Sequence, residues 1–383
     1  MPTDVCGAGF TLFAWPNGSY TGHVQSKRAK TITRTACVAA AAILLGALVG
    51  CADTSYYLQS ARGHLQLMHA AKPIDTWLAD PQTPDTLKKR LELARRMRAF
   101  AVSELGLPDN ASYHRYADLH RRAAVWNAVA APPYSLTLKT WCFPFTGCIG
   151  YRGYFDEAEA RALANQLAAD GMESSVYGVP AYSTLGWMNW LGGDPLLNTF
   201  IGYPEGELAR MLFHELAHQV VYAKDDTQFN ESFATTVERL GGARWLALQA
   251  TDAARAEYAQ FDGRRRQFRG LMLDTRNRLD AVYKDTGNPV AMAERKAEAM
   301  RQFRADYAAL KAQWQGYSGY DPFVERANNA TFGVQAAYDG LVPAFEALYE
   351  REGRDWPRFY AEAKRLAGLP KEQRDENLER LVQ

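Results

Sequence analysis

The sequence has few cysteines, little net charge and no long apolar run. Five Cys among 383 residues exclude a small disulfide scaffold. A balance of 44 basic against 43 acidic side chains gives no support to electrostatic binding of nucleic acid. No uninterrupted apolar run reaches the roughly 20 residues that a spanning helix needs, which excludes a polytopic membrane protein. With 47% hydrophobic and 23% charged residues, the composition is that of a globular protein.

The first fifty residues have the pattern of an export signal. Basic residues are concentrated at 27–34, and the apolar stretch CVAAAAILLGALVG follows at 37–50. This stretch is too short to span a bilayer, and a basic segment before it is typical of a secretory signal. The junction LVGC, which ends at Cys51, resembles the bacterial lipobox, in which this Cys becomes the lipidated first residue. The alternative is a small-residue stretch with a chance Cys.

We therefore expect an exported bacterial lipoprotein that faces the periplasm. Ala52 follows the lipidated Cys, and the Asp that retains lipoproteins in the inner membrane is absent there, which favours the outer membrane. Residues 1–23 fit neither a signal nor a domain, and a start at Val24 would give a signal of ordinary length. In an oxidising compartment, Cys142 and Cys148 are expected to form a disulfide, the alternative being two free buried thiols.

The hydrophobic pattern predicts a mostly α protein with a small β-sheet, that is, an α+β fold with a zincin-like catalytic core and a long helical hairpin. Residues 181–187, AYSTLGW, are expected to form a strand, either an edge strand that pairs with an extended peptide or an ordinary core strand. We divide the chain into a cleaved signal segment (1–50), an N-terminal helical region (51–130), the core with the metal site (131–245), the hairpin (246–320) and a C-terminal helical region of one or two helices that completes the cleft (321–383).

The stretch HELAH carries the main chemical signal. His214 and His218 are four residues apart, so on a helix they share one face and can hold Zn²⁺ together. Glu215 lies about 100° around the helix, where a general base for a metal-activated water is expected. A chance occurrence of HExxH in a chain of this size has a probability of the order of one per cent. The pattern therefore predicts a zinc site with one ion per chain.

The third ligand is expected from NESFA, twelve residues after His218. This segment resembles the NExxA segment of gluzincins such as thermolysin, and more closely the NEGFA segment of the aminopeptidase N family. In those families the Glu of the segment is a zinc ligand, which assigns Glu231 here, although the preceding loop is shorter in this chain. Glu238 is the competing candidate, and we expect it to orient a ligand His through its free N–H. The alternative for Glu238 is a solvated Glu near the end of a helix.

The mature chain also resembles a bacterial family of predicted aminopeptidases that often carry lipoprotein signals. The resemblance rests on YYLQSARG, CFPFTGC with YRGYF, AYSTLGW, FHELAHQ with NESFA, and NNATFGVQAAYDGLVPAFEAL. Because a Tyr donates to the oxyanion in aminopeptidase N, the resemblance suggests Tyr338 for that role, the alternative being an ordinary core Tyr. The GxMEN segment, which grips the substrate's free amine in aminopeptidase N, is absent here, so exopeptidase specificity has no residue to support it.

The function expected from these patterns is that of a lipid-anchored, zinc-dependent peptidase, gluzincin-like, that acts on a peptide substrate. One alternative is a zinc hydrolase of a different bond, such as a cell-wall amide. The other is a non-catalytic envelope lipoprotein in which zinc is a structural staple. Structural zinc sites usually have four protein ligands, and three are found here, which favours catalysis.

Overall fold

The computed structural model describes residues 51–382 apart from 144–146, 185, 187–188, 190–191, 286–287 and 336–339. The expected signal segment 1–50 and Tyr338 therefore lie outside the described residues. The chain divides into two compact units, residues 1–58 and 59–383. Of the first unit, residues 51–58 are described, and they form the beginning of helix α2 (Cys51–Ala70). The candidate site and the contacts around it lie in the second unit.

The fold is mostly helical with short strands, so the predicted α+β class is confirmed. The helices are α3 (Ile74–Ala79), α4 (Asp85–Leu105), α5 (Glu157–Ala169), α6 (Glu205–Ala217), α7 (Thr227–Leu248), α8 (Asp252–Lys284), α9 (Pro289–Gln313), α10 (Asp321–Arg326), α11 (Asn329–Gln335), α12 (Val342–Arg351), α13 (Trp356–Ala367) and α14 (Lys371–Glu379). The strands are β1 (Lys72–Pro73), β2 (Arg115–Ala117), β3 (Val125–Ala131), β4 (Trp141–Phe143), β5 (Gly147–Ile149), β6 (Arg152–Tyr154), β7 (Glu173–Val179) and β8 (Leu196–Leu197).

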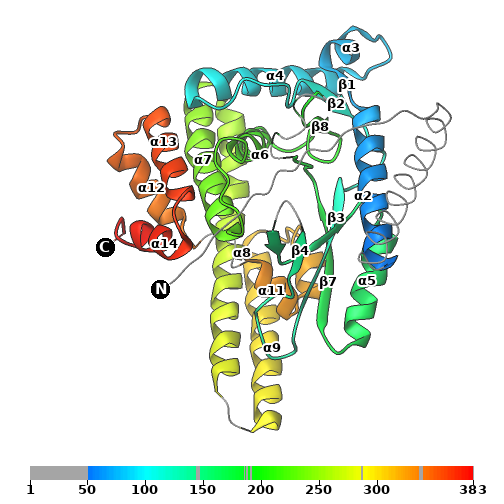
Figure 1. Ribbon diagram of the computed structural model, residues 1–383, viewed down its shortest axis with the longest axis vertical. Coiled ribbons are helices and arrows are strands. Elements are labelled where there is room, and N and C mark those ends of the chain that lie inside the picture. Colours follow the sequence, from blue (N-terminus) through cyan, green and yellow to red (C-terminus); the bar gives the residue numbers. More distant parts are fainter. Residues whose placement is uncertain are drawn as a thin grey trace, which may run out of the picture. The chain divides into compact units, whose positions relative to one another are not determined.

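The longest strands belong to a three-stranded antiparallel sheet in the order β6-β3-β7. Residues 128–131 of β3 are all fully buried, although successive side chains of a strand point to opposite faces. Both faces must therefore be covered, and α5 and α11 pack against β3 and β7 from the two sides (Figure 1). A second sheet has the order β1-β2-β8, and β4 pairs with β5 as a hairpin closed by a disulfide between Cys142 and Cys148.

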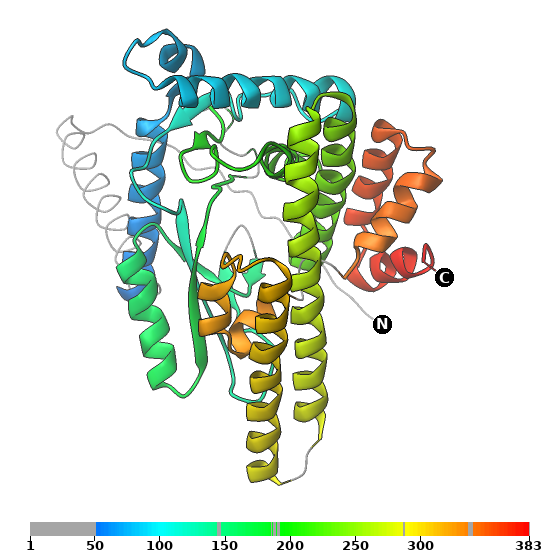
Figure 2. The same cartoon turned by 180° about the vertical axis from the view of Figure 1, so that it is seen from behind.

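The largest apolar cluster surrounds α6. Its buried side chains come from α4, α6, α7, α12 and α13, and α6 packs along α7 (Figure 2). Leu212, Phe213, Leu216 and Ala217 of α6 are completely buried, as the apolar face of the sequence predicts. The long helices α8 and α9 pack against each other and form a second cluster with α10 and α11. In the described part of the chain, no helix is long and apolar enough to cross a membrane.

Two predictions of helical structure are wrong. The expected helical pattern up to residue 130 ends at Leu105, and β2 and β3 follow. The apolar run of β3 is buried on both faces, so its periodicity cannot distinguish a strand from a buried helix. The last 60 residues were expected to hold one or two helices. Their described part holds four complete helices, α11 to α14, and none of these is longer than twelve residues. The helices are short because prolines begin new helices at α12 and α13.

The expected strand at residues 181–187 is also not formed in its described first part, since residues 181–184 have no regular structure. The physical reason is a competing hydrogen bond. The backbone N–H of Thr184 donates to the buried carboxylate of Asp194 at 3.0 Å, and its hydroxyl donates to the same group at 2.8 Å. An N–H bound to a side chain cannot pair with a neighbouring strand. The domain boundaries and the zincin-like core remain predictions.

Candidate metal centre

Helix α6 presents its two histidines from one face. Helix α6 ends at Ala217, and His218 directly after it keeps helical backbone angles, with φ −58° and ψ −22°. The helical spacing is therefore preserved, and the two imidazole rings lie 4.7 Å apart between centroids. Their Nε2 atoms are 3.1 Å apart. The buried apolar face of α6 fixes the helix, so both rings point into the same space.

Helix α7 brings Glu231 to this pair. The turn between the helices is held by Asn230, whose side-chain oxygen accepts from Ala223 N at 2.7 Å and whose amide donates to Ala223 O at 2.8 Å. Asp226 caps α7 by accepting from Phe229 N at 3.0 Å. The first residue of the NESFA segment therefore closes the turn, and the second lies at the histidines.

The three candidate ligand atoms lie close to the separations of a tetrahedral zinc site. Glu231 Oε2 lies 3.3 Å from His214 Nε2 and 3.8 Å from His218 Nε2. Tetrahedral coordination with bonds of 2.0–2.2 Å sets neighbouring ligand atoms about 3.3 to 3.6 Å apart. Among the described residues, these three form a group whose ligand atoms all lie within 4.8 Å of one another. Two imidazole nitrogens and one carboxylate oxygen are also a donor set that zinc prefers, so the residues fit the ion.

Glu238 lies where the sequence places it, beside the other nitrogen of His214. Its Oε2 is 3.0 Å from His214 Nδ1, and its Oε1 accepts from Arg210 Nη2. Burial alone would raise the pKa of Glu238, but Arg210 and His214 outweigh it and lower this pKa to about 2. A carboxylate at Nδ1 favours a proton on that nitrogen, so Nε2 is the nitrogen of His214 that would face a metal.

The two histidines differ in their electrostatic surroundings. Burial lowers the pKa of His218 to about 4, so its imidazole is neutral, the form that binds metals. Burial also acts to lower the pKa of His214, but the carboxylates of Glu231 and Glu238 outweigh it and raise this pKa well above its usual value. Within the described residues, neither buried Nδ1 atom has a partner with full hydrogen-bond geometry, but that of His214 lies 3.0 Å from Glu238 Oε2. His214 is thus the imidazole of the pair that has a carboxylate beside its second nitrogen.

Glu215 is half-buried and follows His214 on α6. Burial raises its pKa to about 7, while the charge of His214 and a hydrogen bond from Ser183 act in the opposite direction. Ser183 also approaches Asp194, with its Oγ 3.5 Å from the carboxylate Oδ2. A carboxylate with a pKa near neutrality is suited to accept and return a proton at neutral pH.

Several residues of this region were not found from the sequence. Arg210 contacts Glu238, and Asp194 holds the segment that reaches Glu215. Tyr113 has a completely buried hydroxyl without a hydrogen-bond partner among the described residues, and its φ of 67° is rare for a residue with a side chain. Burial raises the pKa of Tyr113, and the charge of Glu215 adds to the effect. No spacing pattern marks these residues, because each acts through contacts between distant segments.

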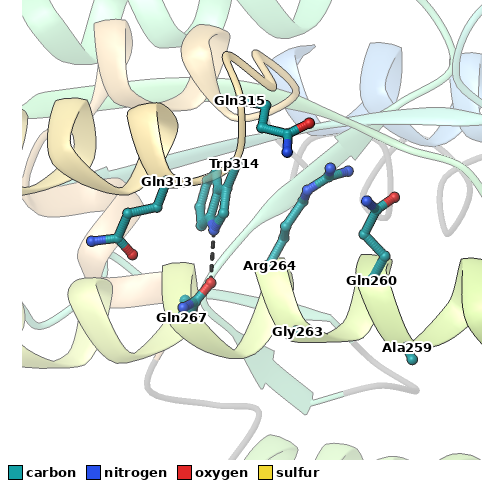
Figure 3. A pocket seen from close by; sticks show the side chains of 8 residues that line it. All are labelled: Ala259, Gln260, Gly263, Arg264, Gln267, Gln313, Trp314 and Gln315. Carbon is teal, nitrogen blue, oxygen red and sulfur yellow. Dashed lines mark hydrogen bonds between the residues drawn. The ribbon is translucent and has the colours of Figure 1, made fainter.

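A hollow on the α8–α9 hairpin offers a contrast (Figure 3). Trp314 forms part of its wall and donates to Gln267 at 2.7 Å, and the side chains of Arg264 and Gln260 border it from α8. The remaining lining residues are Ala259, Gly263, Gln313 and Gln315. These eight residues include no His, Cys, Asp or Glu, so the hollow cannot hold zinc in the manner of the α6–α7 site.

One protein family matches most of the chain. Residues 55–378 match the family described as "Putative aminopeptidase". The chain belongs to this family. Among curated proteins and solved structures, none matches the chain. The matched residues include α6, α7 and the whole candidate centre, and membership of the family supports a peptidase-like function.

Proposed function

We propose that the protein is a zinc-dependent peptidase whose ion is held by His214, His218 and Glu231. The observation that carries the proposal is the convergence of two Nε2 atoms and one carboxylate oxygen at separations of 3.1, 3.3 and 3.8 Å. With three protein ligands, a tetrahedral site keeps one open position for water or substrate, as catalytic zinc sites do. Membership of the aminopeptidase family supports a peptide as the substrate.

The proposed mechanism assigns each side chain one task. When bound, zinc would lower the pKa of a water molecule and polarise the scissile carbonyl. Glu215 would take the proton from this water and pass it to the leaving amine, a task that suits its pKa of about 7. Glu238 would keep His214 oriented through Nδ1, at 3.0 Å. Hydrolysis of a peptide bond would then require proton transfer by one residue only.

Two tyrosines compete for the role of the oxyanion donor. Tyr338 follows from the resemblance to aminopeptidase N and stays a prediction, because it lies outside the described residues. Tyr113 is suggested by its buried, unpartnered hydroxyl, since leaving such a group unpaired costs about 1–3 kcal/mol. A comparison of Tyr113→Phe with Tyr338→Phe separates them. Replacing the tyrosine that is the oxyanion donor by Phe should lower kcat without changing zinc content or the free energy of unfolding.

The direct test combines metal analysis with substrate screening. Purified mature protein should contain about one zinc per chain, and chelation should abolish hydrolysis of a peptide library. Libraries with free and with blocked N-termini distinguish aminopeptidase from endopeptidase activity. Parallel incubation with peptidoglycan identifies a cell-wall amide as the substrate, which would contradict the peptide assignment. Protein that binds zinc but hydrolyses neither substrate would support the structural role instead.

We also propose that the protein is anchored to the membrane, preferably the outer membrane, by lipid on Cys51. Support comes from the LVGC junction after a basic and then apolar leader. Cys51→Ser should move the protein from the detergent phase to the aqueous phase in detergent partitioning, without change in its thermal unfolding. An unchanged detergent-phase signal would contradict the lipid anchor.

A further inference from the structure

Arg210 occupies a buried position next to the candidate metal centre. It precedes His214 by four residues, so both side chains lie along one face of α6. Only 6% of the Arg210 side chain is exposed. A guanidinium is rarely buried to this extent unless it is paired, because its desolvation is costly. Its partners therefore show what holds it in this place.

The first partner is Glu238, which connects Arg210 with the metal centre. Arg210 Nη2 donates to Glu238 Oε1, and Glu238 Oε2 lies 3.0 Å from His214 Nδ1. The carboxylate therefore has one oxygen on the guanidinium and the other on the imidazole. Because both oxygens are engaged, a rotation of the carboxylate would break one of the two contacts. Arg210 thus restricts the group that orients His214.

The other partners come mainly from helix α8. Arg210 Nη1 donates to the hydroxyl of Tyr258 at 3.1 Å and lies 3.5 Å from Asp262 Oδ1. Arg265 extends this network, since it donates to Asp262 and, at 2.6 and 2.7 Å, to Glu207. The Arg210 guanidinium is therefore held by side chains of α8 as well as by Glu238.

Two glycines make room for this arrangement. A Cβ atom at Gly242 of α7 would lie 2.7 Å from Arg210 Cγ, closer than real Cβ contacts. A Cβ atom at Gly206 of α6 would overlap the ring of Tyr258. Both positions are in helices, where Gly costs about 1 kcal/mol relative to Ala. The two glycines, one in α6 and one in α7, thus leave the space in which Arg210 and Tyr258 of α8 approach each other.

We propose that Arg210 is a positioning residue of the metal centre: it fixes the Glu238 carboxylate, and helix α8 supports it through Tyr258 and Asp262. The proposal rests on the zinc function proposed above. It makes the metal affinity of α6 and α7 depend on contacts with the helical hairpin. The competing explanation is that Arg210 only neutralises buried acids, in which case its replacement would change stability and spare zinc affinity.

The test measures zinc affinity of the full mature chain by competition with a chromogenic chelator, and measures stability of the zinc-free protein by urea unfolding. Arg210→Lys keeps the charge, but a single ammonium cannot reproduce the planar fork that reaches Glu238, Tyr258 and Asp262. We expect zinc affinity to fall about tenfold, within the range of about 10- to 100-fold found when groups that orient metal ligands are lost. Arg244→Lys, at an exposed pair with Glu104, is the matched control and should bind zinc like the wild type.

A double variant shows whether Arg210 acts through Glu238. Glu238→Gln should weaken zinc binding about 10- to 100-fold, and adding Arg210→Lys should weaken it no further, because contacts within one network are not additive. Tyr258→Phe removes one hydroxyl and keeps the ring, so its zinc affinity can be measured in place of that of Arg210→Lys if the latter variant does not fold. It should weaken zinc binding about threefold, a smaller effect than loss of Glu238 itself.

The outcomes separate this proposal from the zinc function. Wild-type protein that binds no zinc contradicts the proposed function itself. If the wild type binds zinc and Arg210→Lys retains its affinity, Arg210 is not a positioning residue. Losses that multiply in the double variant would contradict the path through Glu238. Wild-type affinity in Tyr258→Phe would contradict the contribution of α8.

Discussion

Helices α6 and α7 pack against each other, and so do α8 and α9, but the two pairs place their charges differently. On α9, Arg301 and Glu298 form an ion pair whose side chains are about two-thirds exposed. Between α6 and α7, Arg210 and Glu238 form a buried pair, and the Glu238 carboxylate also lies 3.0 Å from His214 Nδ1. Exposed pairs contribute little to stability, whereas buried charges persist only with specific partners. Convergent buried polar groups therefore mark the functional pair.

The largest expected effect comes from Glu215→Gln. Gln matches Glu in size and still forms hydrogen bonds, but it cannot accept a proton. Because loss of a general base costs about 10²- to 10⁴-fold in rate, turnover of a cleavable peptide should fall by that factor. Zinc content should stay at the wild-type level, since Glu215 is not among the proposed ligands. Turnover close to wild type would place the base elsewhere, whatever the metal content.

An intermediate effect is expected at the β4–β5 hairpin, which contacts the turn between the two metal helices. The backbone N–H of Cys148 donates to Asp225 at 3.2 Å. Replacing Cys142 and Cys148 together by Ser removes a short loop closure, worth about 2 kcal/mol of unfolding free energy. Urea unfolding of the oxidised wild type and the double variant measures this loss. Equal stabilities would show that the disulfide does not restrain the unfolded chain.

The smallest effect is expected on the α8–α9 hairpin. Arg301→Ala removes an exposed pair with Glu298, and such pairs contribute about 0–1 kcal/mol. Thermal unfolding should therefore hardly change, and zinc affinity should be that of the wild type. A clear loss of zinc affinity would mean that the exposed face of the hairpin also affects the metal centre, and the contrast between the two helix pairs would fail.

The sequence predicted those parts of the site that depend on local spacing. The four-residue separation of His214 and His218 requires only helical geometry, and the resemblance of NESFA to known segments pointed to Glu231. Glu238 follows Glu231 by two turns of the same helix, so its position could also be predicted. The structure brings all four side chains together.

The rest depends on contacts between distant segments, which no local pattern encodes. Arg210 and Asp262 meet although they are 52 positions apart, and Thr184 loses its strand pairing to a carboxylate ten residues later. The run of buried residues in β3 has no periodicity that would distinguish it from a helix. Packing of separate elements decides these features.

The most direct test of the central claim is the zinc affinity of Glu231→Gln beside that of His218→Ala and Glu238→Gln. The account predicts that replacing either ligand nearly abolishes zinc binding, whereas Glu238→Gln weakens it about 10- to 100-fold and leaves one zinc per chain at saturation. Full zinc affinity in Glu231→Gln, together with loss of zinc in Glu238→Gln, would contradict it. The third ligand would then be Glu238, and the geometry between α6 and α7 would have to be reassigned.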